Sequence, residues 1–364
     1  MCFEVVHEMK RRGHRVLLIY GSEGTGFELY EKAASAAYKI RLAPLGLRNP
    51  VSSATLISRL LRLIRREHID LLFSTNIGNL RTTGVLRLLT GVPAVYHFGL
   101  VCGPDPRIDS FTRWAIRRTS LAIAPTIRVA ESWQAARAAA EWMEVCPNWT
   151  DTDRFRRLGR QERQERRQSL GISPDDPVVI YVGRLSAQKG IPILLEAAKR
   201  LAARGIKFSL VLIGDLESSY KEDFDLSIGA LKLGKCRFHI IPQINNPQDY
   251  LSVADVAVVP GSAPEAFGLT LIEAMSSELP TIAPNANSFA EILGPENADL
   301  LFAPRSIEEC AELLKKWICA DDASRLARGR QLRARVLRDY SAKNAVRYEH
   351  LFFSVAKRSS GLAN

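Results

Sequence analysis

The sequence predicts an α/β protein made of two doubly wound domains, each with a parallel sheet covered by helices. Short runs of apolar, often β-branched residues are typical of strands buried on both faces, and they alternate with segments whose apolar residues recur at helical spacing. This alternation occurs twice, once on each side of a polar segment at 154–168. The chain of 364 residues is also long enough for two domains of ordinary size.

The domain boundaries follow from the same pattern. We expect a first domain over 1–165, a second over 166–340, and a helix at 341–364 that joins the first. The segment 154–168 is dense in Arg, Gln and Glu, which predicts a solvated helix or linker. The expected strands lie at 16–20, 69–74, within 91–99, and at 120–125, 178–182, 208–213, 238–241, 256–260 and 280–283. The expected helices lie at 3–12, 56–66, 80–89, 193–203, 248–254, after Gly268, and at 306–319, 323–338 and 342–357.

The first predicted helix lacks the strand that should precede it in a doubly wound domain. Residues 3–12 read as an amphipathic helix that Gly13 ends as a C-terminal cap, and a buried strand follows at 16–20. In a doubly wound domain such a helix follows a strand and a glycine-rich turn, and both are absent here. Either the true start lies upstream or the N-terminal sheet is built around a gap.

Composition and charge limit the classes of function. A net charge of +11 favours an anionic partner: a nucleotide, a phosphorylated substrate, an acidic membrane surface or a nucleic acid. A nucleic acid is disfavoured, because the arginines are dispersed along helices rather than interleaved with aromatic residues. The sequence shows neither a long apolar run nor a signal-peptide pattern, so we expect no transmembrane helix and a cytoplasmic location. Six scattered cysteines predict neither a zinc site nor a disulfide framework.

The helix expected at 56–66 has a strongly basic face. Its arginines are Arg59, Arg62, Arg65 and Arg66. One interpretation is a helix packed on the sheet with a solvated basic face. The other is a face that touches anionic lipid, which would make the protein peripheral on the inner face of the membrane.

Two glutamates frame the first candidate site. The apolar run at 256–260 predicts a buried strand, and the spacing of apolar residues after Gly268 predicts a helix. Glu265 then lies on the strand-to-helix turn and Glu273 more than a turn into the helix, where side chains lean back toward the N-terminus. Two carboxylates and the free N–H groups of a helix start would share one crevice, which suits a hydroxyl-rich ligand with an anionic end. The alternative is two glutamates at unrelated exposed positions.

A second set of polar groups follows the strand at 178–182. The loop 183–190 carries Arg184 and Lys189 just before a helix start. A guanidinium can bind bidentately and an ammonium as a point charge, so the loop suits a diphosphate; the alternative is two exposed loop cations. His97, near the end of another strand, is a further candidate, with a structural histidine as its alternative.

Together these motifs resemble the retaining GT-B glycosyltransferases of group one, family four. The resemblance rests on Gly183-Arg184-(four residues)-Lys189-Gly190 and on Glu265-(seven residues)-Glu273 with Phe267-Gly268-Leu269 between them. It covers nearly the whole chain and is strongest from about 177 to 320. It implies two Rossmann-like domains facing a cleft, with the first strand of the N-terminal domain and its glycine-rich loop missing.

The resemblance implies a role for each matching residue. Arg184 and Lys189 would hold the diphosphate of a nucleotide-sugar as it leaves, Glu265 would contact sugar hydroxyls, and Glu273 would hold the ribose hydroxyls. The implied donor-binding residues are Gly183, Arg184, Lys189, Glu265, Ala266, Phe267, Gly268, Leu269 and Glu273, and the implied catalytic residues are Glu265, Arg184, Lys189 and His97. Fixed cations and a helix start would lie where negative charge grows, so neither a metal nor another cofactor is expected.

Four positions depart from the family pattern. The family often has a histidine two positions after His97, where this chain has Gly99. Its paired glycines before a later glutamate appear as Asn287-Ser288, and a usual glycine appears as Glu278. Such changes would stiffen or crowd loops where backbone approaches a ligand.

The expected function is transfer of a sugar from a nucleotide-sugar to a glycan or a lipid-linked glycan, with retention of configuration and without a metal. The C-terminal half would bind the donor and the N-terminal half the acceptor. The alternative is a catalytically impaired GT-B module that keeps a nucleotide-binding or partner-binding role, which the absent first strand favours.

Overall fold

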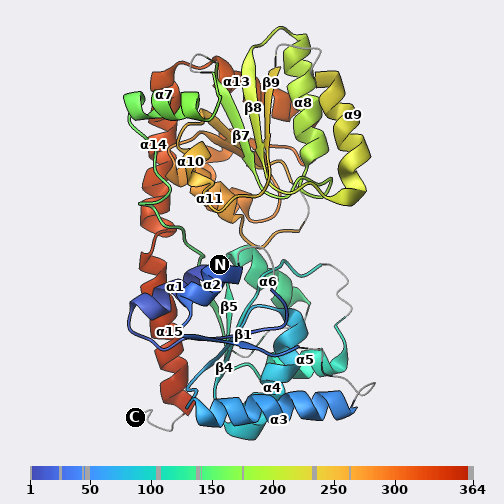
Figure 1. Ribbon diagram of the computed structural model, residues 1–364, viewed down its shortest axis with the longest axis vertical. Helices are drawn as coiled ribbons and strands as arrows, with labels where there is room; N and C mark the ends of the chain where they lie inside the picture. The colour runs from blue at the N-terminus through green and yellow to red at the C-terminus, as the bar shows by residue number, and fades with distance from the viewer. Residues whose placement is uncertain are drawn as a thin grey trace. The chain divides into compact units, whose positions relative to one another are not determined.

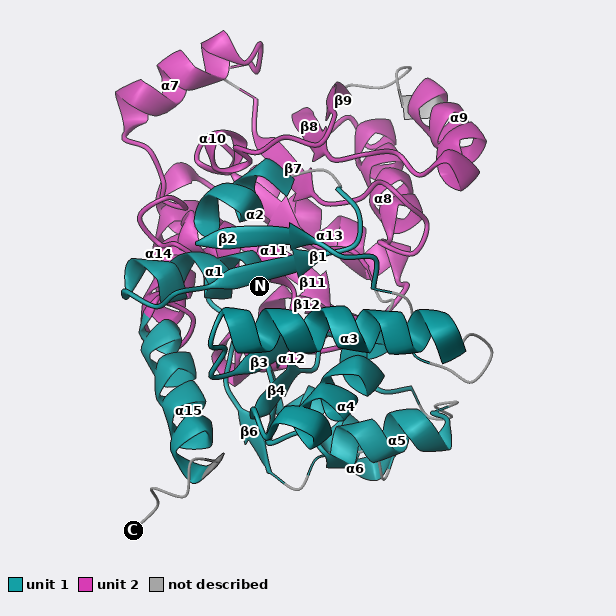
Figure 2. Cartoon of the chain, turned by 60° about the horizontal axis from the view of Figure 1, so that its bottom comes forward, with its two compact units in different colours: residues 1–149, 343–364 teal, residues 150–342 magenta. Residues whose placement is uncertain are grey.

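The computed structural model divides into two compact units. Unit 1 is Met1–Trp149 with Lys343–Asn364, and unit 2 is Thr150–Ala342 (Figure 2). The structure describes residues 2–23, 27–42, 45, 50–103, 108–136, 140, 142–173, 176–231, 236–261 and 264–359. The division falls earlier than the boundary expected at 165, so the polar segment at 154–168 belongs to unit 2. The last helix belongs to unit 1.

Unit 2 is built on one parallel sheet with strand order β12-β11-β10-β7-β8-β9. Its strands are β7 Val178–Val182, β8 Phe208–Ile213, β9 Cys236–Ile241, β10 Val256–Val258, β11 Thr281–Pro284 and β12 Leu301–Phe302. Its α-helices are α7 Arg160–Ser169, α8 Ile191–Ala203, α9 Lys221–Leu231, α10 Gln248–Leu251, α11 Leu269–Ser276, α12 Phe289–Leu293, α13 Ile307–Cys319 and α14 Asp322–Asp339. The strand order reverses beside β7, and at such a switch point a crevice opens outside the carboxyl ends of the strands.

Both faces of this sheet are covered, as the continuous apolar strands predict. Val179 and Tyr181 of β7 pack into a core that α8, α9 and α13 help to form. Val178 and Ile180, which alternate with them, pack into a second core with Leu251 of α10. The helices therefore lie on both sides of one layer of strands (Figure 1).

Within its described residues, unit 1 contains two separate parallel sheets, with orders β1-β2 and β3-β4-β5-β6. Its strands are β1 Leu17–Tyr20, β2 Ala36–Lys39, β3 Leu72–Ser74, β4 Ala94–His97, β5 Leu121–Ala124 and β6 Met143–Val145. Its α-helices are α1 Cys2–Arg11, α2 Phe27–Ala33, α3 Pro50–Arg66, α4 Leu80–Thr90, α5 Ser110–Arg117, α6 Ile127–Ala135 and α15 Lys343–Ser359. The expectation of a buried strand at 16–20 was wrong, because every residue of β1 is only half-buried.

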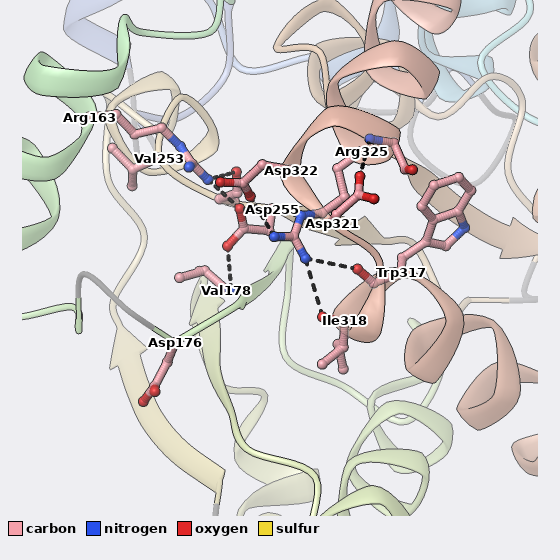
Figure 3. A network of polar contacts seen from close by, with 12 residues as sticks. Arg163, Asp176, Val178, Val253, Asp255, Trp317, Ile318, Asp321, Asp322 and Arg325 are labelled. Carbon is pink, nitrogen blue, oxygen red and sulfur yellow. Dashed lines mark hydrogen bonds and ion pairs between the residues drawn. The ribbon is translucent and has the colours of Figure 1, made fainter.

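The segment 154–168, expected as a solvated helix or linker, contains the helix α7, which is largely exposed but has one packed face. Arg163 and Arg167 of α7 each place a guanidinium nitrogen 2.5 Å from the carboxylate of buried Asp255, which directly precedes β10. That carboxylate also accepts the backbone N–H of Val178 at 2.7 Å. Arg325 of α14 lies 3.8 Å from it and bonds to the end of α13 (Figure 3). The network fastens α7 and α14 at the amino ends of β7 and β10.

Among the described helices, none combines the length and the apolar character that a bilayer crossing demands.

Candidate functional site

The predicted cationic loop and the predicted glutamate lie on neighbouring strands of unit 2. The loop 183–190 follows β7 and the segment 264–268 follows β10, and these two strands pair in parallel. The backbone of the loop at Gly190 lies very close to the backbone at Pro260. A Cβ built on Gly190 would lie 2.4 Å from the Pro260 carbonyl oxygen. Only glycine permits that approach, and its φ of +78° is in the left-handed region as well.

Lys189 and Glu265 form an ion pair at this carboxyl edge. The Nζ–Oε2 distance is 2.9 Å. Their side chains remain 43% and 28% exposed, so both can exchange partners with a ligand from solvent. An exposed pair of this kind adds little to stability, and its position at the end of two central strands favours a binding role.

Arg184 lies on the same loop with an exposed side chain and a fixed backbone. The hydroxyl of Tyr181 donates to the Arg184 carbonyl at 2.8 Å. Burial, and then the neighbouring Glu265, raise the pKa of Tyr181, so this hydroxyl stays a donor. A Cβ on Gly183 would lie 2.8 Å from the same hydroxyl, and one on Gly214 would lie 2.0 Å from the Gly183 carbonyl oxygen.

Contacts with later residues of the chain fix the turn into α11. Gly268 is the N-cap residue, with a φ of +90°, and a Cβ there would lie 2.7 Å from the ring of Phe289. The Ser288 hydroxyl donates to the Ala266 carbonyl at 2.9 Å. Phe267 is buried against the edge of the Tyr340 ring. The start of α11 is thereby fixed beside Glu265.

The remaining predicted residues of unit 2 extend the same edge. Leu269 opens α11 and is half-buried, and Glu273 lies in the second turn with a half-buried side chain. The structure thus brings Arg184, Lys189 and Glu265 onto two adjacent loops, with Glu273 on the helix that follows the second.

His97 belongs to unit 1 and is buried at the end of β4. Its Nε2 donates to Asn148 Oδ1 at 3.0 Å, and the Tyr348 ring of α15 lies 6.4 Å away. Burial lowers the pKa of His97 to about 4, although the Asn148 contact opposes the shift. The imidazole is therefore neutral at neutral pH, and a direct catalytic role for it stays a prediction.

Several residues at the site escaped the sequence patterns. Tyr181 reads as an ordinary member of an apolar strand, and Gly261 carries no motif of its own. A Cβ on Gly261 would lie 3.0 Å from the Lys189 carbonyl oxygen. Its partner is far away in the sequence, and no local spacing could have indicated it.

The described residues contain no group of three or more His, Cys, Asp or Glu side chains placed to hold a metal ion. The pair Asp151 and Asp153 forms a turn instead. Asp151 Oδ1 accepts the backbone N–H groups of Asp153 and Arg154 at 3.0 Å each.

Two family models match the amino-acid sequence. The model described as "Glycosyl transferases group 1" matches residues 162–332, and the model described as "Glycosyltransferase Family 4" matches residues 1–154. They therefore cover the two halves of the chain in turn.

Among similar curated proteins, the sulfoquinovosyl transferase SQD2 of Arabidopsis thaliana is 27% identical over 333 residues, which is 85% of this chain and 61% of that protein. The alpha-D-kanosaminyltransferase of Streptomyces kanamyceticus is 26% identical over 223 residues, 59% of this chain and 55% of that protein. The chain thus spans little more than half of the length of such relatives.

Among solved structures, Anabaena HepE in complex with UDP superposes with a TM-score of 0.81 at 19% identity, over 97% of this chain and 95% of that one. A glycosyltransferase from Rickettsia africae gives a TM-score of 0.82 at 18% identity, over 98% and 93%. At this level of identity the similarity establishes the GT-B fold.

Proposed function

Because the chain belongs to the group 1 and family 4 glycosyltransferases in its two halves, we propose that it transfers a sugar from a nucleotide-sugar donor to a glycan or lipid-linked acceptor. The transfer retains the anomeric configuration and needs no metal ion. The observation that carries the proposal is the meeting of Lys189 and Glu265 at the carboxyl edge of β7 and β10, beside Arg184 and the start of α11.

The cations of this edge suit the leaving group. Breaking the bond between the anomeric carbon and the diphosphate leaves negative charge on the diphosphate. Arg184 is exposed and free to bind two phosphate oxygens, and Lys189 can exchange its carboxylate partner for a third. Groups already fixed where charge grows lower the barrier without reorganisation.

The carboxylates suit the rest of the donor. Glu265 accepts hydrogen bonds from sugar hydroxyls once Lys189 turns to phosphate, and Glu273 accepts those of the ribose. The backbone from Ala266 to Leu269 faces the sugar and the phosphates, since it forms the turn into α11. Unit 1 binds the acceptor, whose hydroxyl oxygen forms the new bond to the anomeric carbon while its proton passes to the departing diphosphate.

The test measures UDP binding by calorimetry, because HepE was solved with UDP. Arg184→Ala removes a charge-assisted contact worth about 1.5–3 kcal/mol, so we expect UDP affinity to fall by about 10- to 100-fold. Arg204→Ala is the matched control, since Arg204 lies just past α8 and pairs with Glu308 and Glu312. We expect it to leave the affinity unchanged, and EDTA to change neither protein.

Absence of any UDP or GDP binding by the natural chain would contradict the proposed donor site. Equal losses in the two arginine variants would assign the effect to net charge rather than to the loop. The relatives are named for transfer of different sugars, so the sugar is found by screening UDP-sugars for release of UDP.

A second candidate is a nucleotide-binding module without turnover, which the interrupted sheet of unit 1 favours. This module would have the same donor site as the transferase but would not transfer the sugar. Tight UDP binding with no release of UDP from any donor, with or without acceptor, would support it over the transferase.

An anionic membrane surface is a further proposed partner. Arg59, Arg62, Arg65 and Arg66 of α3 are all exposed, while Leu56 and Leu60 of that helix are buried against the unit. Each surface cation contributes about 1 kcal/mol near anionic lipid. Flotation with vesicles of phosphatidylcholine alone and with added phosphatidylserine tests this, and equal flotation with both would reject it.

A further inference from the structure

Exposed apolar side chains follow three neighbouring strands of unit 1, each at the same step along the chain. In every case the side chain belongs to the residue three positions beyond the last residue of the strand. These residues, which we call the apolar rim, are Ile77 after β3, Leu100 after β4 and Ile127 after β5. Their exposed fractions are 41%, 60% and 54%.

The apolar rim lies along one edge of a sheet. β3 pairs with β4 and β4 with β5, all in parallel, with Ser74 opposite Tyr96 and His97 opposite Ile123. The carboxyl ends of neighbouring strands therefore differ by one residue. Since neighbouring strands lie about 4.8 Å apart, the three strands span about 10 Å. Single exposed apolar residues are common, but a row of them outside the carboxyl ends of parallel strands indicates a binding site.

The backbone that carries Ile77 and Ile127 is fixed. Ile77 is the first residue of the 3₁₀ turn η1 Ile77–Asn79, and the Asn76 side chain accepts a backbone N–H of that turn. Ile127 is the first residue of α6, and the Thr126 side chain caps that helix in the same way. Both side chains start from ordered backbone, so little entropy is lost when a ligand covers them.

Helix α6 fixes the backbone of Leu100. The Leu100 carbonyl accepts the Nε1–H of Trp133 at 2.9 Å, and the backbone N–H of Cys102 donates to the Ser132 hydroxyl at 3.0 Å. Buried Phe98 stacks on the Trp133 ring, with the ring centroids 4.3 Å apart. The loop after β4 is thus held against α6, while the Leu100 side chain remains exposed.

The carboxyl edge of unit 2 is chemically different. Three residues after β7 stands Leu185, which is fully buried, and three residues after β10 stands Gly261, which has no side chain. The groups that those loops offer to a ligand are the charges of Arg184, Lys189 and Glu265. An edge that suits a diphosphate and an edge that presents apolar side chains recognise different chemistry.

Charge is scarce beside the apolar rim. One charged residue, Arg128, and no carboxylate occurs in the segments that follow the three strands, 75–79, 98–103 and 125–129. The polar side chains of Asn76 and Thr126 already accept backbone N–H groups of their own turns. An aliphatic group suits this edge better than a set of sugar hydroxyls, because contact removes the apolar surfaces of both partners from water.

We propose that the apolar rim binds an aliphatic chain of the acceptor, an inference that rests on the proposed function, in which unit 1 binds the acceptor. The acceptor is then amphipathic. A hydroxyl-bearing head receives the sugar, and an alkyl or acyl chain attached to that head covers Ile77, Leu100 and Ile127. Of the two acceptor classes named above, the lipid-linked one fits this edge and the free glycan does not.

The test measures binding of methyl, butyl and octyl β-D-glucoside to the full 364-residue chain, below the concentrations at which micelles form. 1-Octanol is titrated as well, because it carries the chain without a sugar head. The methyl signals of Ile77, Leu100 and Ile127 are followed by NMR. A half-buried CH₂ group improves affinity about twofold, and octyl exceeds methyl glucoside by seven such groups, so we expect about 100-fold tighter binding of octyl glucoside.

The double variant Leu100→Asn/Ile127→Asn removes two of the three rim side chains. Both are exposed, so the variant should fold normally, which circular dichroism checks. We expect its affinity for octyl glucoside to fall by about tenfold. The matched control is Leu88→Asn/Leu89→Asn, because these residues are also 60% and 54% exposed and lie in the last turn of α4, which leads into the amino end of β4. The control should bind octyl glucoside as the natural chain does.

Three results would overturn the proposal. One is that octyl glucoside and octanol bind no better than methyl glucoside, or shift methyl signals outside the rim alone. Another is an equal loss of octyl glucoside binding in the rim and control variants, which would indicate non-specific contact with exposed apolar residues. The third is a rim variant that floats less with phosphatidylcholine vesicles but binds octyl glucoside normally, because the rim would then contact a bilayer surface.

A parallel titration with UDP separates this inference from the proposed transfer. Binding that depends on chain length, in a protein that binds no nucleotide, would contradict the transferase and still support an aliphatic chain on the rim. Binding of UDP without any binding of octyl glucoside or octanol would leave the donor site in place and reject the amphipathic acceptor.

Discussion

At the scale of single residues, Glu278 and Asn287 are among the non-glycine residues with left-handed backbone. Glu278 has a φ of +58° and Asn287 a φ of +54°. Both are positions where the family pattern has glycine. Asparagine tolerates this conformation, whereas a longer side chain costs about 1–2 kcal/mol. The departures read from the sequence thus correspond to real backbone demands in unit 2.

His97 makes the stability of unit 1 depend on pH. The unfolded chain binds a proton at this residue below a pKa of about 6.5, whereas burial lowers the folded pKa to about 4. Between these values only the unfolded state is protonated, so the free energy of unfolding decreases as the pH falls. We expect a loss of about 3 kcal/mol across this window, measured by urea unfolding at each pH.

His97→Gln should flatten that profile, because glutamine does not titrate and can still reach Asn148. His7→Gln is the control, since His7 is exposed on α1. A His97→Gln profile as steep as that of the natural protein would show that other groups cause the acid sensitivity.

The charged residues that the structure brings together at the ends of β7 and β10 could be selected from the sequence, whereas the groups that position their loops could not. Arg184 and Lys189 are conspicuous in the sequence because they are charged residues between glycines. Glu265 is conspicuous because it lies just before a predicted helix start. Tyr181 and Ser288 act through backbone carbonyls on other loops. Such contacts depend on which strands become neighbours, and hydrophobic periodicity does not specify strand order.

At the scale of elements, α14 packs on the end of α11 through a glycine. A Cβ built on Gly329 would lie 1.9 Å from the Glu278 carbonyl oxygen. Gly329→Ala must therefore push the helix away from backbone, and we expect a loss of about 2–3 kcal/mol. Thermal and urea unfolding followed by circular dichroism measures it.

The matched control is the same substitution in an open helix. Gly229 lies on α9, and a Cβ there would meet nothing within 4 Å. Gly229→Ala should stabilise by about 1 kcal/mol through helix propensity alone. If both substitutions acted in the same direction, the close contact between α14 and Glu278 would not be what limits residue 329.

The buried carboxylate of Asp255 holds three elements together. Burial alone would raise its pKa, but Arg163 and Arg167 lower it, so the group stays charged. Asp255→Asn leaves buried guanidinium groups without their counter-charge, and we expect a loss of about 3–5 kcal/mol in unit 2. UDP affinity of the folded variant should not change, because the network lies at the amino ends of the strands.

Asp225→Asn is the control, since Asp225 is exposed on α9. It should change stability by no more than about 0.5 kcal/mol. A small effect of Asp255→Asn would mean that water or other carboxylates satisfy the arginines.

Strongly periodic elements were predicted well, and elements that depend on a distant partner were not. The strand at 208–213 has the expected bounds, and the helix expected after Gly268 begins at Leu269. The mixed charges of α7 predicted a solvated helix or linker, which its mostly exposed residues fit, but they did not predict that Arg167 would pair with a buried carboxylate. The apolar run of β1 suggested burial, whereas each of its residues is only half-buried.

At the scale of the whole molecule, donor binding should act mainly on unit 2. At UDP concentrations about 100-fold above Kd, binding stabilises the occupied state by about 2.7 kcal/mol. We expect the amides of 183–190 and 264–268 to slow most in hydrogen exchange, and those of β4 and β5 to slow least. Exchange mass spectrometry with and without UDP measures this, and Arg184→Ala should remove the difference.

A larger change in unit 1 than in unit 2 would place the nucleotide elsewhere.

The two-domain plan itself was readable from two series of alternating strands and helices. The boundary was not, because α7 has the composition of a linker and the packing of a domain.

The division of the chain has a consequence for synthesis. Unit 1 is assembled from two separated segments, whereas unit 2 is one continuous stretch between them. Helix α15 buries Tyr348 against Trp149 within unit 1. During translation, unit 2 can therefore finish folding before α15 of unit 1 has been synthesised. Until then, the apolar residues of unit 1 that pack against α15 stay uncovered.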